Sequence, residues 1–63
     1  MNLRLTLKAL RANSNMKQSD VAKKLGISTT TWSKWENRKS FPDVSRVKEI
    51  EKLFGVVYDD IIF

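Results

Sequence analysis

Residues 29–35, with the sequence TTTWSKW, combine side chains that could contact nucleic acid with side chains that could fill a hydrophobic core. Aromatic rings among basic and hydroxyl groups can stack on bases, and threonine and lysine can hydrogen-bond to base edges in a DNA groove. Tryptophans three residues apart also share one side of a helix, where they would be buried. The pattern therefore leaves base stacking and core packing as alternatives.

A helical projection at about 100° per residue separates the two kinds of side chain. Trp32 and Trp35 share one side, so we expect both to face inward. The opposite side has no large apolar residue and no acid, and it carries Thr29, Thr30, Ser33, Lys34 and Asn37. Short hydroxyls, an amide and an ammonium suit the DNA major groove, which admits a helix and presents donors, acceptors and thymine methyl groups. The alternative is an ordinary solvated face.

The charge distribution favours a polyanionic partner for the first two thirds of the chain. The net charge of the 63 residues is +5, but it is unevenly spread. Residues 1–41 carry nine basic side chains against Asp20 and Glu36, a net charge of +7, whereas residues 42–63 carry three basic and five acidic side chains, a net charge of −2. This asymmetry is typical of proteins that bind nucleic acid, although a lysine-rich solvated surface would give the same composition.

Several function classes are disfavoured by composition. The chain has no Cys and no His, which excludes disulfides and thiolate metal sites and removes the commonest general base. There is no glycine-rich phosphate loop, and Asp59 and Asp60 are interpreted as first-turn residues of a helix. We therefore expect no enzyme, no cofactor, no metal and no small-molecule ligand. No apolar run approaches the roughly 20 residues of a membrane span, so we expect a cytoplasmic protein without membrane contact.

The elements that must position the polar side are short helices. Apolar spacing predicts helices over residues 2–13, 18–25, 29–36 and 44–54, and a last short helix over 58–62 with Ile61 and Ile62 turned inward. The first carries the stripe Leu3, Leu7 and Leu10. The predicted fold class is all-α, a compact bundle of four to five short helices in one domain over residues 1–63.

Capping residues delimit these helices. Ser28 and Asp43 are good N-cap residues, Gly26 and Gly55 are C-terminal stop signals, and Asn15 tolerates the left-handed conformation that ends many helices. A short helix, a turn containing Gly26 and a second, polar-faced helix form a helix-turn-helix arrangement. The apolar residues expected to hold the two helices together are Val21, Ala22, Leu25, Ile27, Trp32 and Trp35.

The run KQSDVAKKLGISTTTWSKWENRKSFP resembles the helix-turn-helix of the Xre and phage lambda-type repressors, and the likeness covers nearly the whole chain. It implies a second helix over about 18–25 and a recognition helix over about 29–36. It further implies sequence-specific binding of double-stranded DNA by a phage or bacterial repressor, acting as a homodimer on a palindromic operator. The alternative is a protein-interaction module on the same fold, such as an antitoxin or adaptor.

The resemblance also implies roles for individual residues. Base contacts fall to Thr29, Thr30, Ser33 and Lys34. Phosphate contacts fall to Gln18, Ser28 and Asn37, and Gln18 would also brace the recognition helix. Arg11 and Glu36 match a structural ion pair between the first and third helices.

Three positions depart from the family pattern. Lys17 stands where an N-cap residue is usual, and Arg38 stands where glycine is common, so a left-handed Arg38 would cost about 1 kcal/mol or more. Either the turn differs, or Arg38 and Lys39 contact phosphates, as Lys17 could. Trp32 replaces a smaller aliphatic residue, and its indole N–H needs a partner. Because the chain ends in the apolar run IIF, we expect an N-terminal domain of a longer regulator.

Overall fold

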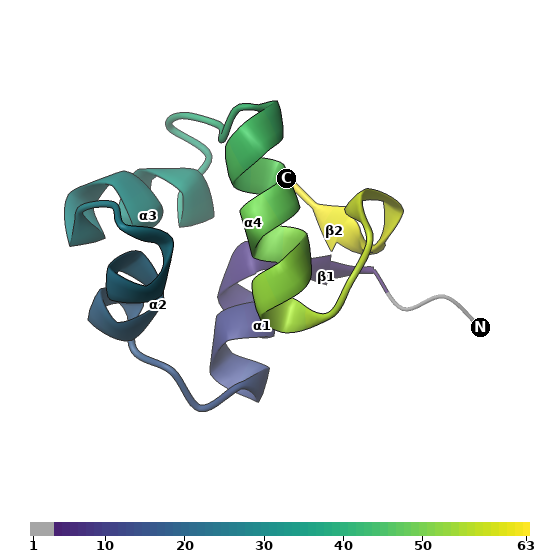
Figure 1. Cartoon of the computed structure of the whole chain (residues 1–63), viewed down its shortest axis with the longest axis horizontal. Helices are drawn as coiled ribbons and strands as arrows, with labels where there is room; N and C mark the ends of the chain where they lie inside the picture. Colours follow the sequence, from purple (N-terminus) through teal and green to yellow (C-terminus); the bar gives the residue numbers. More distant parts are fainter. Residues whose placement is uncertain (1–3) are drawn as a thin grey trace.

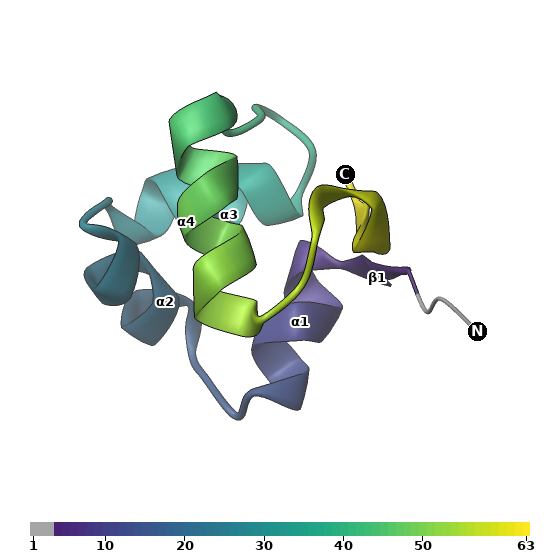
Figure 2. The same ribbon diagram turned by 45° about the vertical axis from the view of Figure 1, so that its right-hand side comes forward.

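Four helices and a small sheet make up the computed structural model, which describes residues 4–63 (Figure 1). In chain order the elements are β1 (Leu5–Thr6), α1 (Leu7–Asn13), α2 (Gln18–Leu25), α3 (Thr29–Glu36), α4 (Val44–Phe54), the 3-10 turn η1 (Tyr58–Asp60) and β2 (Ile61–Ile62). α2 and α3 lie against each other, α4 runs through the middle of the molecule, and β1 and β2 lie on the side away from α2 (Figures 1 and 2). The prediction of a bundle of short helices is confirmed.

The helix ends form where the capping residues predict them. The Ser28 hydroxyl accepts a hydrogen bond from the Thr31 N–H at 3.1 Å, and the Asp43 carboxylate accepts one from the Arg46 N–H at 2.9 Å. Gly26 ends α2 with a φ of 69°. This left-handed conformation is inexpensive for glycine, which has no Cβ. The turn between α2 and α3 is therefore only three residues long, Gly26 to Ser28, and it holds the two helices close together.

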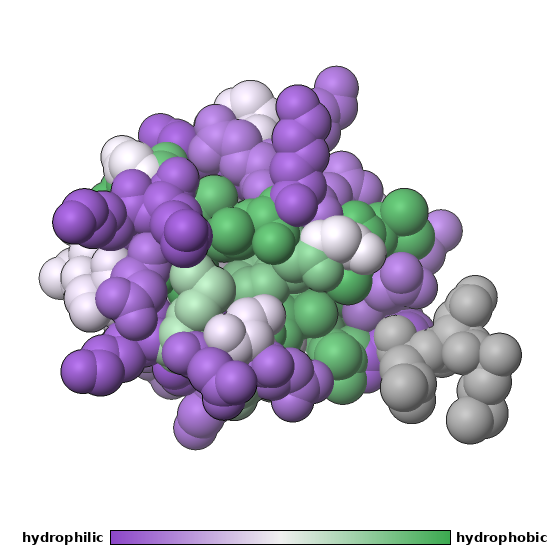
Figure 3. Space-filling view, turned by 60° about the horizontal axis from the view of Figure 1, so that its bottom comes forward, coloured by the Kyte–Doolittle hydropathy of each residue, from purple (hydrophilic) through white to green (hydrophobic). Residues whose placement is uncertain are grey.

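Each of the four helices contributes residues from one of its sides to the hydrophobic core. Its buried residues are Leu7, Leu10, Val21, Ala22, Leu25, Trp32, Trp35, Ile50 and Ile61. Trp32 has no exposed surface, and its ring centroid lies 5.9 Å from that of Trp35 and 6.3 Å from that of Phe54. A domain this small cannot cover its core completely, and hydrophobic surface shows between hydrophilic side chains on one face (Figure 3). Both tryptophans face inward, as predicted.

The first predicted helix is too long at its start. Residues 5 and 6 are extended and pair in parallel with β2, Leu5 opposite Ile61 and Thr6 opposite Ile62. Thr6 has an extended backbone, and its hydroxyl accepts a hydrogen bond from the Ala9 N–H at 3.1 Å, so it is the N-cap of α1. A helix cannot pass through an extended N-cap residue. The predicted apolar position Leu3 lies outside the described residues.

The predicted helix over residues 58–62 is also wrong in part. Only residues 58–60 turn, as the 3-10 element η1, and residues 61 and 62 form β2. The Tyr58 N–H donates to the Glu51 carboxylate at 2.8 Å. Pairing with β1 then suits the β-branched Ile61 and Ile62, and Ile61 is buried while Ile62 is only half-buried. The fold is therefore mostly helical rather than entirely so.

None of the helices described over residues 4–63 has the length and hydrophobicity that crossing a membrane requires.

Candidate nucleic-acid interface

The exposed side of α3, with the start of α2 and the segment after α3, borders an open hollow of about 430 Å³. Its lining residues are Gln18, Thr29, Thr30, Ser33, Lys34, Asn37 and Lys39. All four residues predicted to contact bases lie here, together with three of the six predicted to contact phosphates. We call these seven residues the polar hollow.

The polar hollow is cationic. It contains two ammonium groups, Lys34 and Lys39, and no carboxylate. Its remaining groups are hydroxyls and amides, which can act as donors or acceptors. A concave surface of this kind attracts an anionic partner and offers it hydrogen bonds in both directions. The described residues contain no group of three or more His, Cys, Asp or Glu side chains that could hold a metal ion.

Two of the contact residues are tied to each other before any partner binds. The Asn37 amide donates to the Ser33 carbonyl at 2.9 Å and to the Ser33 hydroxyl at 3.2 Å. The Ser33 carbonyl also accepts a hydrogen bond from the Asn37 backbone N–H at 2.9 Å, so the side-chain amide adds a second donor at the end of α3. This arrangement orients both side chains, so less conformational entropy is lost when they form contacts.

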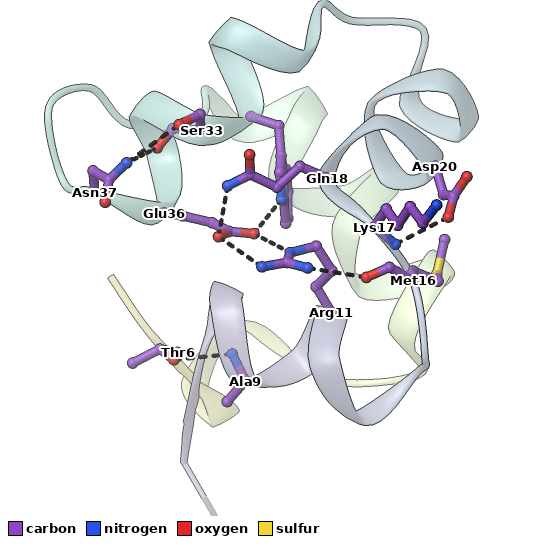
Figure 4. A network of polar contacts seen from close by, with 11 residues as sticks. Thr6, Ala9, Arg11, Met16, Lys17, Gln18, Asp20, Ser33, Glu36 and Asn37 are labelled. Atoms are coloured by element: carbon purple, nitrogen blue, oxygen red, sulfur yellow. Dashed lines mark hydrogen bonds and ion pairs between the residues drawn. The ribbon is translucent and has the colours of Figure 1, made fainter.

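Beneath the polar hollow, a carboxylate joins three helices (Figure 4). Glu36 of α3 accepts hydrogen bonds from Arg11 of α1, at 2.6 Å from Nε and 3.3 Å from Nη2. It also accepts one from Gln18 of α2 at 3.1 Å and one from the Trp32 indole N–H. The Glu36 side chain is 3% exposed and that of Arg11 is 16% exposed. Arg11 also donates to the Met16 carbonyl at 3.0 Å, so the network reaches the connection between α1 and α2 as well.

The environment of Glu36 keeps its carboxylate ionised. Burial raises its pKa because it disfavours the charged form. The hydrogen bonds from Arg11, Gln18 and Trp32, with the positive charge of Arg11, outweigh this effect and lower the pKa overall. The ionised carboxylate then holds α3 against α1 and α2 at neutral pH.

Gln18 belongs to both the network and the polar hollow. Its amide nitrogen donates to Glu36, while the side chain lines the hollow beside α3. A group that contacts a ligand there is thus connected directly to the carboxylate that positions α3. This geometry fits the bracing role that the resemblance implies for Gln18.

The other three residues predicted to contact phosphates lie outside the polar hollow. The Ser28 hydroxyl caps α3 and also pairs with the Thr31 hydroxyl at 2.8 Å. Lys17 is exposed at the start of α2 and its side chain makes no cap hydrogen bond, whereas the Asp20 carboxylate accepts a hydrogen bond from the Lys17 N–H at 2.9 Å. Arg38 is left-handed, with a φ of 60°, and borders a separate hollow of about 180 Å³ that also includes Lys8.

One interaction escaped prediction although its signal was present. The Trp32 indole needed a partner, and Glu36 stands four residues later, which places it on the same helix side. Hydrogen bonds from Arg11 and Gln18 hold the Glu36 side chain in the protein interior, where its carboxylate accepts a hydrogen bond from the buried indole.

Comparison with known proteins identifies relatives of the chain. Residues 7–61 match the sequence model of a helix-turn-helix family. The chain is 38% identical over 56 residues to the HTH-type transcriptional activator BcrR of Enterococcus faecalis, covering 89% of this chain and 28% of that protein. It is 44% identical over 55 residues to the uncharacterized HTH-type transcriptional regulator MJ0272 of Methanocaldococcus jannaschii, covering 87% of this chain and 83% of that protein. No solved structure matches the chain.

Proposed function

The chain belongs to the helix-turn-helix family of the Xre and lambda repressor type, and from this premise we propose that it is the sequence-specific DNA-binding domain of a transcription regulator. Both relatives are named as transcription regulators, which agrees with a protein that is not an enzyme. BcrR is much longer than this chain, so the proposal concerns the DNA-binding unit.

The observation that carries the proposal is the polar hollow. It places the hydroxyl and ammonium groups of α3 on one exposed side, free of carboxylates, while the other side of the same helix is buried. In a helix-turn-helix, the second helix enters the major groove with such a side facing the bases. A protein-binding module is less well matched to this surface, because protein interfaces are depleted in lysine and serine and the hollow has no apolar or aromatic lining residue.

Each lining group has a chemistry that matches part of a DNA duplex. Lys34 can donate to guanine O6 and N7, and the methyl groups of Thr29 and Thr30 can contact thymine. The Ser33 hydroxyl can donate or accept. We propose that these four groups read bases, while Gln18, Asn37 and Lys39 from the hollow, with Lys17, Ser28 and Arg38 around it, contact phosphates. Base contacts would supply specificity, and phosphate contacts would supply salt-dependent affinity.

The size of the domain favours two copies on one site. A single DNA-binding module of this class buries only about 600–1,000 Å², which limits its affinity. Two copies on half-sites one helical turn apart would read a palindrome. We propose repression as the direct consequence of binding, because blocking polymerase requires only occupancy of the operator. Such a protein would act where the chromosome lies, in the cytoplasm or nucleoid.

Removal of two reading groups tests the proposal. A palindromic duplex is first selected from a random pool with the wild-type protein, and binding is then measured for a Thr30→Ala/Lys34→Ala variant. Each lost base contact is expected to cost about 1–3 kcal/mol of binding free energy, while thermal unfolding stays near the wild-type value because both side chains are exposed.

The matched control is Lys52→Ala, which removes the same charge from α4, away from the polar hollow. It should retain binding. If the wild-type protein selects no duplex, or if the double variant binds as tightly as Lys52→Ala, the DNA-binding proposal fails and the protein-interaction alternative gains support.

A further inference from the structure

A second hollow, of about 180 Å³, lies between the end of α3 and the start of α1. Figure 4 shows these two ends beside each other, with Glu36 on α3 and Thr6 at the start of α1. We call it the second hollow. It shares no residue with the polar hollow, and its polar lining groups are Thr6, Lys8, Trp35, Glu36 and Arg38. Of these five residues, only Arg38 is proposed above to contact DNA.

The second hollow has an excess of positive charge. Lys8 and Arg38 both line it, and neither takes part in an ion pair within residues 4–63. The one side-chain carboxylate in the lining, that of Glu36, is paired with Arg11 and is only 3% exposed. Apolar side chains from α1 and the end of the chain complete the lining. Because low-dielectric walls focus the field of the charges between them, this hollow attracts an anion.

Trp35 adds a neutral hydrogen-bond donor to the two cations. Its ring lines the second hollow and is 7% exposed. The indole N–H makes no hydrogen bond to any residue in the described range. Since every buried side-chain nitrogen there has a partner, this N–H belongs to the exposed edge of the ring. An indole N–H can only donate, so all three groups require acceptors, and the several oxygens of a phosphate can satisfy them together.

The backbone after α3 separates the two hollows. Asn37 and Lys39 line the polar hollow, whereas Arg38 between them lines the second hollow. Arg38 has a φ of 60°, a conformation that residues with a Cβ rarely adopt. A chain of phosphates that follows residues 37–39 would therefore meet both hollows in succession.

The place of the second hollow fits the course of a DNA backbone. In a helix-turn-helix, the N-terminal residues of the second helix contact base edges, so the C-terminal end of α3 lies toward the rim of the groove, where the phosphates run. The major groove is only about 12 Å wide, whereas the molecule measures 33 × 24 × 20 Å. Parts of the protein beside α3 must therefore lie over the backbone.

We propose that the second hollow holds one phosphate of the DNA backbone, with Lys8 and Arg38 as its charged partners and the Trp35 N–H as a neutral donor; the inference rests on the proposed DNA-binding function. Lys8 and Trp35 are additional contact residues, since neither the sequence pattern nor the polar hollow assigns them to DNA. Through Lys8, α1 takes part in binding directly and does more than support α3.

Neutralising single phosphates tests the assignment of Lys8. One phosphate at a time is replaced by an uncharged methylphosphonate in a half-site duplex selected by the wild-type protein. We expect one position, outside the base pairs that α3 reads, where the replacement weakens wild-type binding about ten-fold and hardly affects Lys8→Gln. On the unmodified duplex, the slope of log K against log salt should be about 0.9 smaller for Lys8→Gln.

Trp35→Phe separates the neutral donor from the two charges. The variant keeps a ring and loses the N–H, so binding should weaken while the salt slope stays at the wild-type value. The loss should disappear when the same phosphate is a methylphosphonate. Thermal unfolding verifies that both variants are folded at the temperature of the binding measurement.

The matched control is Lys52→Gln, which removes the same charge from an exposed position of α4 outside the second hollow. It should respond to every methylphosphonate as the wild type does. The inference is overturned if no phosphate position distinguishes Lys8→Gln from wild type, if Lys52→Gln behaves like Lys8→Gln, or if Trp35→Phe binds as tightly as wild type.

A free anion is the other source of the same chemistry. Inorganic phosphate is added to the DNA-free protein at constant ionic strength while tryptophan fluorescence is recorded, and we expect no saturable change. A saturable change that Lys8→Gln abolishes, with no backbone position linked to Lys8, would assign the hollow to a free anion and overturn the inference. Failure of the proposed function looks different, since the wild-type protein would then bind no duplex.

Discussion

The two sides of α3 use polar groups in opposite ways. On the inner side, the Glu36 carboxylate accepts hydrogen bonds from three residues and is almost completely shielded from solvent. On the outer side, the groups of Thr29, Thr30 and Lys34 are exposed and open to a partner. Of the described side chains, no buried nitrogen or oxygen lacks a hydrogen-bond partner.

The difference shows how eight residues can serve both folding and binding. Inner-side groups interact with α1 and α2, so replacing them should reduce stability, and any loss of DNA binding should follow from that. Outer-side groups interact with little of the protein, so replacing them should reduce binding alone. Variants on the two sides should therefore be distinguishable by comparing unfolding with DNA binding.

The largest effect is expected from Trp32→Ala. Removing this fully buried ring leaves a cavity, and we expect the free energy of unfolding to fall by about 3–5 kcal/mol. Since a 63-residue domain has only about 3–9 kcal/mol of stability, the variant should be largely unfolded. Urea denaturation followed by circular dichroism measures the change.

Two further variants keep this prediction testable if Trp32→Ala does not fold. Trp32→Phe retains a ring but loses the N–H that donates to Glu36, and it should unfold at a lower urea concentration than wild type. Thr30→Ala on the outer side should stay within about 0.5 kcal/mol of wild type. A Trp32→Ala variant with wild-type stability and no DNA binding would mean that the two sides are assigned in reverse.

The next largest effect is expected from Glu36→Ala. The substitution leaves Arg11, Gln18 and Trp32 without their shared acceptor, and we expect a loss of about 2–3 kcal/mol in the free energy of unfolding at pH 7. A double-mutant cycle with Arg11→Ala measures how much of that loss belongs to the pair. Additive single effects would show that the contact contributes nothing specific.

The pH dependence of stability provides an independent control for Glu36. Its pKa is lowered in the folded protein, so its contribution is complete above the unfolded value of about 4.3 and is lost as the pH falls through the lower folded value. The wild-type protein should therefore lose stability on acidification below about pH 4.3. Glu36→Ala should lose less, and an identical pH profile for both proteins would contradict the role assigned to Glu36.

The smallest effect is expected at the end of α3, from Arg38→Gly. Arg38 has a φ of 60°, which costs a residue with a Cβ about 1 kcal/mol. Glycine relieves that strain but loses more conformational entropy on folding. We expect a net gain of about 0.5 kcal/mol in stability together with weaker, less salt-dependent DNA binding if Arg38 contacts a phosphate.

Asn15→Gly is the matched control for Arg38→Gly. Asn15 is also left-handed, with a φ of 56°, but asparagine tolerates this conformation better than arginine does. The gain in stability should be smaller than at Arg38, and DNA binding should not change. A larger gain at Asn15 would show that strain is not what distinguishes the two sites.

Local signals were sufficient for the middle of the chain. The bounds of α2 and α3 were predicted from apolar spacing and from two capping residues, Gly26 and Ser28. These signals act within a few residues, so they can be recognised without knowledge of the fold. The separation of tryptophans from hydroxyls on α3 follows from helical geometry alone.

Both ends of the chain were predicted less well for the same physical reason. Leu5 and Ile61 are 56 residues apart in the sequence and become neighbours only in the folded molecule. A pairing of two residues per strand has no periodicity of its own, so Leu5 was counted within a helix and Ile61–Ile62 within another. Tertiary contact overrides weak local preference in segments this short.

By itself, the sequence determined α2, α3 and α4, the inward side of α3 and the cationic character of the outward side, because apolar spacing, caps and charge act locally. The tertiary structure alone decided which groups meet. It added Gln18 and Trp32 to the Arg11–Glu36 pair that the resemblance implied, and it gathered seven residues around the polar hollow. These contacts depend on the distances and angles between helices, which only the packing of the whole core sets.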